Sequence, residues 1–99
     1  MEYTYDVVMK TQLGNRKGKL YVRRTQEEIN GCLNILGHEN PVVGTVAEDG
    51  TYALKGKLIT LVRTIPFLAQ GYADEKAVRL TLHCPSNIFY ITGTAIKGE

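Results

Sequence analysis

The sequence predicts an all-β fold: a small antiparallel up-and-down β-barrel of about eight strands, in a single domain that covers residues 1–99. Apolar residues alternate with other residues along most of the chain, which is typical of strands that bury one face. The alternating runs are joined by short stretches rich in turn residues, which favours a meander. A glycine also recurs on the buried face of successive runs, where a sheet bends sharply or another layer comes close. These observations together predict one sheet that coils tightly into a barrel.

The recurring unit is an apolar residue, any residue, glycine, any residue and a second apolar residue. Three clear copies and two weaker ones follow in order: Ile29-x-Gly31-x-Leu33, Val42-x-Gly44-x-Val46, Leu54-x-Gly56-x-Leu58, Ala69-x-Gly71-x-Ala73 and Ile91-x-Gly93-x-Ala95.

The first two strands are expected at residues 3–10 and 19–24, joined by a turn at 13–18 that is rich in glycine and other turn residues. The third segment, residues 25–37, admits two interpretations. Its start fits a helix capping box, and its apolar residues also have helical spacing. A central Gly31 would cost such a helix about 1 kcal/mol. Because the segment shares the glycine repeat of its neighbours, we favour a strand.

Residues 38–41 are expected to form a turn, because Pro41 keeps the residue before it out of the helical region. Strands at 42–47 and 51–58 then flank Glu48-Asp49-Gly50, the clearest hairpin turn in the chain.

Residues 59–72 are apolar on both faces, so either one strand bends there or a short crossover near 60–64 separates two strands. Strands at 77–83 and 88–96 complete the sheet. The predicted inward set is Ile29, Leu33, Val42, Val46, Leu54, Leu58, Leu80, Leu82, Phe89 and Ile91.

Eight alternating strands in a meander resemble the calycin-type barrels of the lipocalins and the avidins. The resemblance concerns architecture only. The chain contains no tryptophan, so it lacks the Gly-x-Trp start of lipocalins and the tryptophan-lined pocket of avidins. The resemblance therefore implies a fold but no ligand and no binding residue.

Composition narrows the class of protein without naming a function. The apolar fraction of 43% and the charged fraction of 22% are ordinary for a globular domain, and a net charge of +2 does not by itself imply a polyanionic partner. No apolar run approaches the roughly 20 residues that span a bilayer, and the acidic, alternating N-terminus lacks the features of a signal peptide. We expect a cytoplasmic protein whose Cys32 and Cys84, on opposite faces, remain reduced thiols.

A basic hairpin is the first candidate site. Residues 7–26 contain six cations and no acid, with Tyr21 among them, and such a hairpin contacts phosphates and stacks a base. The alternative, which we favour, is a solvated hairpin whose charge is balanced by acids nearby in the sequence. The candidate nucleic-acid-binding residues are Lys10, Arg16, Lys17, Lys19, Arg23 and Arg24.

Arg63 is the second candidate, because it lies in the apolar stretch LITLVRTIPFL and must reach water or a partner. At the mouth of a barrel it would bind a carboxylate or phosphate, with Tyr52 and Tyr72 as further ligand-binding residues. The alternative is an arginine whose stem packs while its head is hydrated.

No motif specifies a chemistry. His38, His83 and Cys84 lack the spacing of a zinc site, and no nucleophile or phosphate-loop signature is present, so we predict no catalytic residue, metal or cofactor. Three hypotheses remain: a non-enzymatic assembly module that forms a homodimer through residues 59–72, a barrel that binds a small apolar or anionic ligand, and weak nucleic-acid binding. We expect no membrane as a partner, and a nucleic acid is the least favoured of the three hypotheses.

Overall fold

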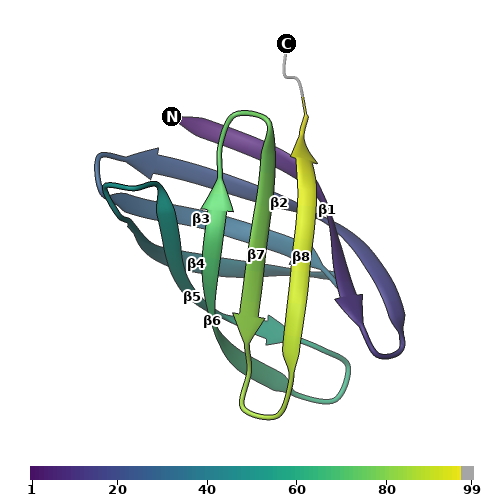
Figure 1. Cartoon of the computed structure of the whole chain (residues 1–99). Coiled ribbons are helices and arrows are strands. Elements are labelled where there is room, and N and C mark those ends of the chain that lie inside the picture. Colours follow the sequence, from purple (N-terminus) through teal and green to yellow (C-terminus); the bar gives the residue numbers. More distant parts are fainter. Residues whose placement is uncertain (97–99) are drawn as a thin grey trace.

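A computed structural model describes residues 1–96 and shows one closed antiparallel barrel (Figure 1). Each strand pairs with its neighbours in the sequence, and β8 closes the barrel by pairing with β1. The predicted all-β meander is confirmed. The strands are β1 (Glu2–Thr11), β2 (Gly14–Thr25), β3 (Glu28–Ile35), β4 (His38–Val46), β5 (Thr51–Ile59), β6 (Thr64–Ala73), β7 (Ala77–His83) and β8 (Ile88–Ala95).

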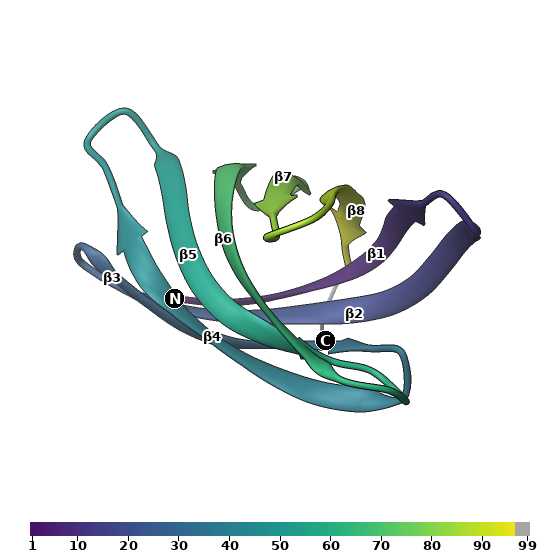
Figure 2. The same ribbon diagram turned by 90° about the horizontal axis from the view of Figure 1, so that it is seen from below.

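The turns of the barrel gather in two groups, one at each end. Because the strands alternate in direction, the turns after β1, β3, β5 and β7 meet at one end, which we call the mouth end. The N-terminus and the turns after β2, β4 and β6 lie at the opposite end (Figure 1). Viewed from below, the curved strands β2 to β5 wrap beneath β7 and β8 (Figure 2). No helix that could span a membrane occurs within the described part of the chain.

Inward-facing side chains fill the barrel. All ten predicted inward residues are confirmed: nine are buried, and Phe89 is half-buried against the same core. The remaining core residues continue the same alternation and include Tyr5, Val7, Met9, Leu20, Val22, Ile35, Tyr52, Phe67, Ala69 and Val78. A barrel of this size has an interior just wide enough for its own side chains, so room for another molecule is found at its ends.

The repeated glycines lie where neighbouring strands come too close for a side chain. A Cβ atom on Gly31 would contact the carbonyl oxygen of Tyr21 on β2, and one on Gly71 would contact the carbonyl oxygen of Arg79 on β7. Gly71 is also the cross-strand partner of the buried Tyr52. Small residues beside large ones let the sheet bend while the interior stays filled. The interpretation of the repeat as a sign of tight coiling is confirmed.

The strand interpretation of residues 25–37 is also confirmed, but the turn predicted at 38–41 is wrong. The chain turns at Leu36 and Gly37, whose φ angles are +57° and +79°, and β4 begins at His38. Positive φ at both residues is the geometry of a two-residue type I′ hairpin turn. Pro41 lies within β4, one residue before the pairing with β5 begins, and a proline is tolerated at the margin of a ladder.

The structure also defines the turns after β1 and after β5. The first is shorter than predicted, and the second decides between the two alternatives for residues 59–72. The first hairpin turns at residues 12–13 rather than 13–18, so Arg16 and Lys17 belong to β2. Between β5 and β6 the chain forms a separate turn at residues 60–63, which confirms the crossover alternative for the segment 59–72. In that turn the hydroxyl of Thr60 donates to the carbonyl oxygen of Arg63 at 2.7 Å.

Candidate functional site

The mouth end carries a cavity of about 570 Å³, which we call the mouth pocket. Volumes of about 300–1,000 Å³ are typical of small-molecule sites. Its floor consists of the buried Met9 and Leu58 and the half-buried Phe89, and Leu36 and Ile65 form its walls. Its remaining lining residues are Thr11, Gln12, Leu13, Arg16, Thr60, Leu61, Val62 and Asn87.

Three aliphatic side chains on the rim are almost fully exposed. The exposed fractions are 87% for Leu13, 99% for Leu61 and 87% for Val62. Leu13 lies in the turn after β1, and the other two lie in the turn after β5. All three line the same pocket, so residues 48 positions apart in the sequence form one apolar rim.

A buried asparagine holds the strands together below this rim. Asn40 is fully buried, and its Nδ2 donates to the carbonyl oxygens of Leu33 at 2.8 Å and His38 at 3.2 Å. Its Oδ1 accepts from the backbone N–H of Ile59 at 2.8 Å. The side chain therefore joins β3, β4 and β5 and fixes the residue that leads into the Thr60 turn. Because both the nitrogen and the oxygen of this buried amide already have hydrogen-bond partners, Asn40 has a structural role and is not free to bind a ligand.

Leu36 shows backbone strain at the pocket wall. It is one of two non-glycine residues with positive φ in residues 1–96, and it packs against the core. The left-handed conformation costs an ordinary L-residue roughly 1–2 kcal/mol. Asparagine or glycine would fit this turn with less strain. Leucine is more strained there, but its side chain gives the pocket an apolar wall.

Arg16 is the cation that faces the mouth pocket. It pairs with Met9 across β1 and β2, and directly opposed residues share a face of the sheet. Since Met9 is in the core, the Arg16 side chain starts from the inner face at the point where β2 emerges from the barrel. Among residues 1–96 it forms no ion pair, and its head is exposed at the rim.

The three residues expected to bind a ligand do not converge. Arg63 lies at the mouth end in the turn after β5, where it is exposed and lines a small adjacent depression of about 90 Å³. Tyr52 is a core residue toward the opposite end, and Tyr72 is 58% exposed on the outer face of β6. Only Arg63 is near the mouth pocket, so these residues do not form one site.

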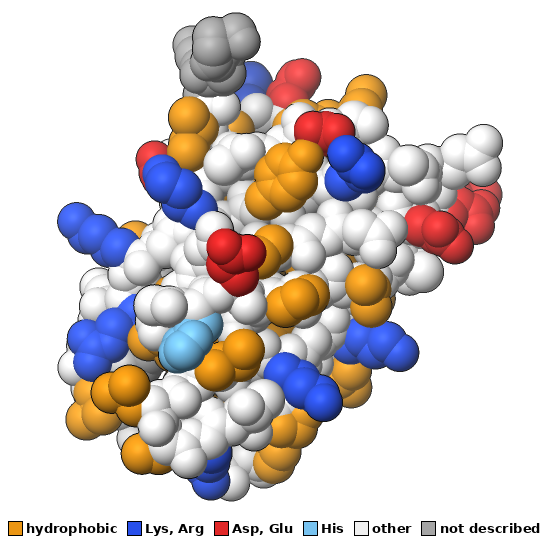
Figure 3. Space-filling model, turned by 180° about the vertical axis from the view of Figure 1, so that it is seen from behind, with side chains coloured by type: hydrophobic (Ala, Val, Ile, Leu, Met, Phe, Trp, Pro, Cys, Tyr) orange, Lys and Arg blue, Asp and Glu red, His pale blue; other side chains and the backbone are white. Residues whose placement is uncertain are grey.

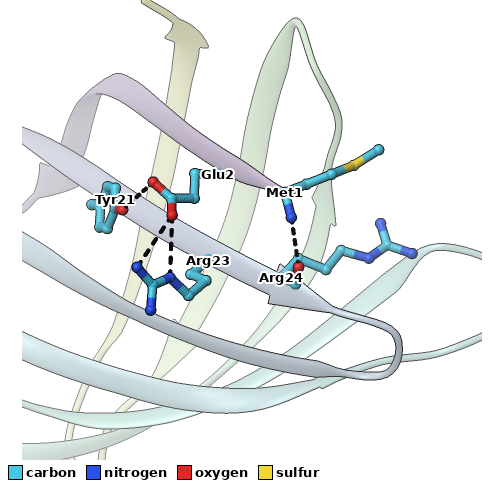
Figure 4. Close-up of polar contacts among 5 residues, drawn as sticks. All are labelled: Met1, Glu2, Tyr21, Arg23 and Arg24. Carbon is cyan, nitrogen blue, oxygen red and sulfur yellow. Dashed lines mark hydrogen bonds and ion pairs between the residues drawn. The ribbon is translucent and has the colours of Figure 1, made fainter.

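The basic hairpin is divided between two faces and partly neutralised. Lys19 forms an ion pair with Asp6 at 2.7 Å, and Arg23 forms one with Glu2 at 3.2 Å. Glu2 also accepts a hydrogen bond from the Tyr21 hydroxyl, which lowers the pKa of Glu2, with Arg23 adding to the effect (Figure 4). Both acids, Glu2 and Asp6, lie on β1 and precede the acid-free residues 7–26. Lys10, Arg16 and Lys17 are left exposed without an ion pair in the described chain.

Arg24 belongs to the inner face at the opposite end. It pairs with the core residue Ile29 on β3. Figure 4 shows the Arg24 side chain pointing away from Glu2 and its partners Tyr21 and Arg23. Beneath it, the hydroxyl of Tyr52 is buried and has no hydrogen-bond partner among the described residues. Burial raises the pKa of Tyr52, while the positive charge of Arg24 acts in the opposite sense.

The outer wall of the barrel carries a second apolar feature, which we call the outer groove. It crosses β4 to β7 and is lined mainly by Pro41, Val43, Ile59, Pro66, Leu68, Cys84 and Pro85. Val43 and Leu68 are 42% and 64% exposed. Lys55 and Lys57 lie along the same groove on β5. The apolar segment 59–72 contributes Ile59, Pro66 and Leu68 to this apolar lining.

The surroundings of the two thiols and of the possible metal ligands are defined in residues 1–96, where the thiols lie on β3 and after β7. Cys32 and Cys84 are both free, and burial raises the pKa of each thiol, which disfavours the reactive thiolate. Within residues 1–96, no three His, Cys, Asp or Glu side chains come close enough to hold a metal ion.

Comparison with protein-family models, with curated proteins and with solved structures finds no match to this chain.

Proposed function

We propose that this protein binds a small amphipathic anion in the mouth pocket, with the apolar body of the ligand on the floor of the pocket and its carboxylate or phosphate at Arg16. The observation that carries the proposal is the combination of a cavity of about 570 Å³, an apolar floor and walls, and one unpaired cation on the rim. Ligand sites are typically apolar, with a small number of placed polar groups that fix orientation.

The two parts of the site have separate energetic roles. Burying the apolar body removes hydrocarbon surface from water, which contributes about 25 cal/mol for each Å². The guanidinium of Arg16 supplies charge-assisted hydrogen bonds in a fork that matches a carboxylate or a phosphate. Thr11, Thr60 and Asn87 lie around the same opening and offer further polar contacts to the head of the ligand.

A displacement titration tests the proposal. The chain contains no tryptophan, so the fluorescent anion anilinonaphthalene sulfonate serves as a reporter, and decanoate or decanol is added as competitor. We expect both competitors to displace the reporter. Arg16→Gln should weaken decanoate about tenfold, the effect of losing one hydrogen bond to a charged group, and should leave decanol unchanged.

Two variants separate this site from unspecific binding. Ile65→Trp projects an indole ring into the pocket from its half-buried wall, which obstructs the apolar floor and should abolish displaceable binding. Arg79→Gln removes an exposed arginine from the outer face of β7 and should change nothing. The proposal fails if neither competitor displaces the reporter, or if Arg16→Gln and Arg79→Gln have equal effects.

Self-association through the outer groove is the second candidate function. It is favoured by the exposed Val43 and Leu68, which lie on either side of Lys55 in one mainly apolar groove, since exposed apolar surface of this kind marks interaction sites. Light scattering across a concentration series should then show a dimer that Leu68→Lys converts to a monomer. A wild-type monomer at the highest concentration would exclude this function.

A further inference from the structure

The two ends of the barrel carry opposite charge. The mouth end, taken as residues 10–17, 34–39, 57–64 and 83–88, holds five lysines and arginines and one acid, Glu39. The opposite end, taken as residues 1–4, 23–28, 46–52, 72–77 and 94–96, holds seven carboxylates and three cations. Counting side chains alone, the formal charges of the two ends are +4 and −4, although the whole chain has a net charge of only +2.

The cations of the mouth end are available to a partner. They are Lys10, Arg16, Lys17, Lys57 and Arg63, and all five are exposed. None of these five cations forms an ion pair with the described residues. The two ion pairs within residues 1–96 involve other cations, Lys19 and Arg23. In Figure 3, the lower third of the visible face shows lysine, arginine and hydrophobic side chains but no acidic ones.

Apolar tips project from the same end. Leu61 is 99% exposed, and Leu13 and Val62 are each 87% exposed, at the crests of two hairpin turns. An isolated exposed leucine needs no explanation. Three nearly bare aliphatic side chains around one opening form a patch, and patches of this kind mark contact surfaces.

We infer that the mouth end docks onto an anionic lipid surface, with Leu13, Leu61 and Val62 inserted among the acyl chains and the five cations against the headgroups. Aliphatic tips within a ring of lysine and arginine match the layering of a leaflet, apolar below and negatively charged at its surface. The acidic opposite end would face away from the membrane. Docked in this way, the mouth pocket opens toward the acyl region, where amphipathic anions are found.

The surface suits a lipid better than a nucleic acid. Proteins that bind single strands stack bases on aromatic side chains, whereas the tips at the mouth end are aliphatic. The aromatic residue of the basic hairpin, Tyr21, lies farther along β2 with its hydroxyl bound to Glu2. A nucleic acid would also leave Leu61 and Val62 in water, with no contact for their exposed surface.

Co-sedimentation with vesicles tests the inference. Vesicles of phosphatidylcholine containing about one third phosphatidylserine should bind the protein at low salt, and binding should weaken as salt screens the charges. Vesicles of phosphatidylcholine alone should bind it much more weakly. Leu61→Ser with Val62→Ser should reduce partitioning more than about tenfold. Arg16→Gln with Arg63→Gln should reduce it about 25-fold, or about fivefold for each charge.

Matched changes elsewhere provide the controls. Tyr72→Ser removes a 58% exposed apolar side chain, and Arg79→Gln an exposed arginine, both away from the mouth end; neither should alter partitioning. Ile65→Trp blocks the mouth pocket without removing a tip or a charge, so it should abolish ligand displacement and leave vesicle binding intact. The two proposals therefore fail separately.

Three results would overturn the inference. The first is the absence of sedimentation with anionic vesicles at low salt. The second is equal loss of binding in Leu61→Ser/Val62→Ser and in Tyr72→Ser. The third is retention of a single-stranded oligonucleotide, sensitive to Arg16→Gln, by a protein that ignores vesicles, which would assign the mouth end to nucleic acid.

Discussion

Asn40→Ala tests how the mouth end is held together. The substitution removes all three hydrogen bonds of a fully buried side chain. The N–H of Ile59 and the carbonyl oxygen of Leu33 would then lose their side-chain partner, and each unsatisfied buried group costs about 1–3 kcal/mol. We expect a loss of about 3 kcal/mol in the free energy of unfolding. For a domain of this size that lowers Tm by about 15 °C.

Urea unfolding followed by circular dichroism measures the loss, and amide hydrogen exchange locates it. The N–H of Ile59 should exchange much faster in the variant, because its acceptor is gone, and the neighbouring Thr60 turn should loosen with it. Asn30→Ala is the matched control: Asn30 is exposed on the same strand as Leu33, and its loss should cost less than about 0.5 kcal/mol. Equal effects of the two variants, or an Ile59 amide that stays protected in Asn40→Ala, would refute this account of the mouth end.

Three further predictions concern single sites. Tyr52→Phe removes a buried hydroxyl that lies near the Arg24 guanidinium and makes no hydrogen bond within the described chain, and it should change stability by less than about 1 kcal/mol in thermal unfolding; a loss of about 2 kcal/mol or more would mean that the hydroxyl is bonded. Gln26→Gly relieves a positive φ of +40° in the exposed turn after β2 and should raise stability by about 0.5–1 kcal/mol, whereas a fall in Tm would contradict it. Backbone N–H groups of Lys76 and Ala77 donate to Asp74 and lower its pKa. The unfolded chain therefore takes up the proton first as pH falls, so this contribution is full above about pH 5 and is lost toward the folded pKa. Asp74→Asn should flatten the decline of Tm in acid, and an unchanged pH profile would contradict it.

The fold could be predicted because its signal is local and repeated. Alternation assigns each side chain to a face, and a one-residue slip would expose the whole inner set, so Leu33, Val42 and Leu54 could be placed in the core from the sequence. The glycine repeat added the curvature, since Gly31 and Gly71 lie where a Cβ atom would meet the next strand. The turn at Leu36 and Gly37 was missed because leucine is an uncommon residue in the left-handed conformation that it adopts there.

The mouth end could not be predicted because it is assembled across the barrel. Leu13 comes from one turn and Leu61 from another, and nothing in either local sequence indicates that the two share an opening. Arg16 was grouped with Lys17 in a basic run, but β2 extends back to Gly14, so the two side chains fall on opposite faces. Arg63 could be singled out from its apolar surroundings, and the structure places it at the mouth end, beside the pocket rather than in it. The position of a side chain on a closed sheet depends on register, which composition does not reveal.

Chemical-shift mapping with decanoate shows directly whether the mouth pocket is the binding site. On addition of decanoate to the labelled protein, amides of residues 11–16, 60–65 and 87–89 should shift together and saturate, because these segments line the mouth pocket. Amides of the opposite end, such as residues 26–28 and 49–51, should stay in place. Shifts that never saturate, or that map to the outer groove of β4 to β7, would contradict the claim that the mouth pocket is the binding site.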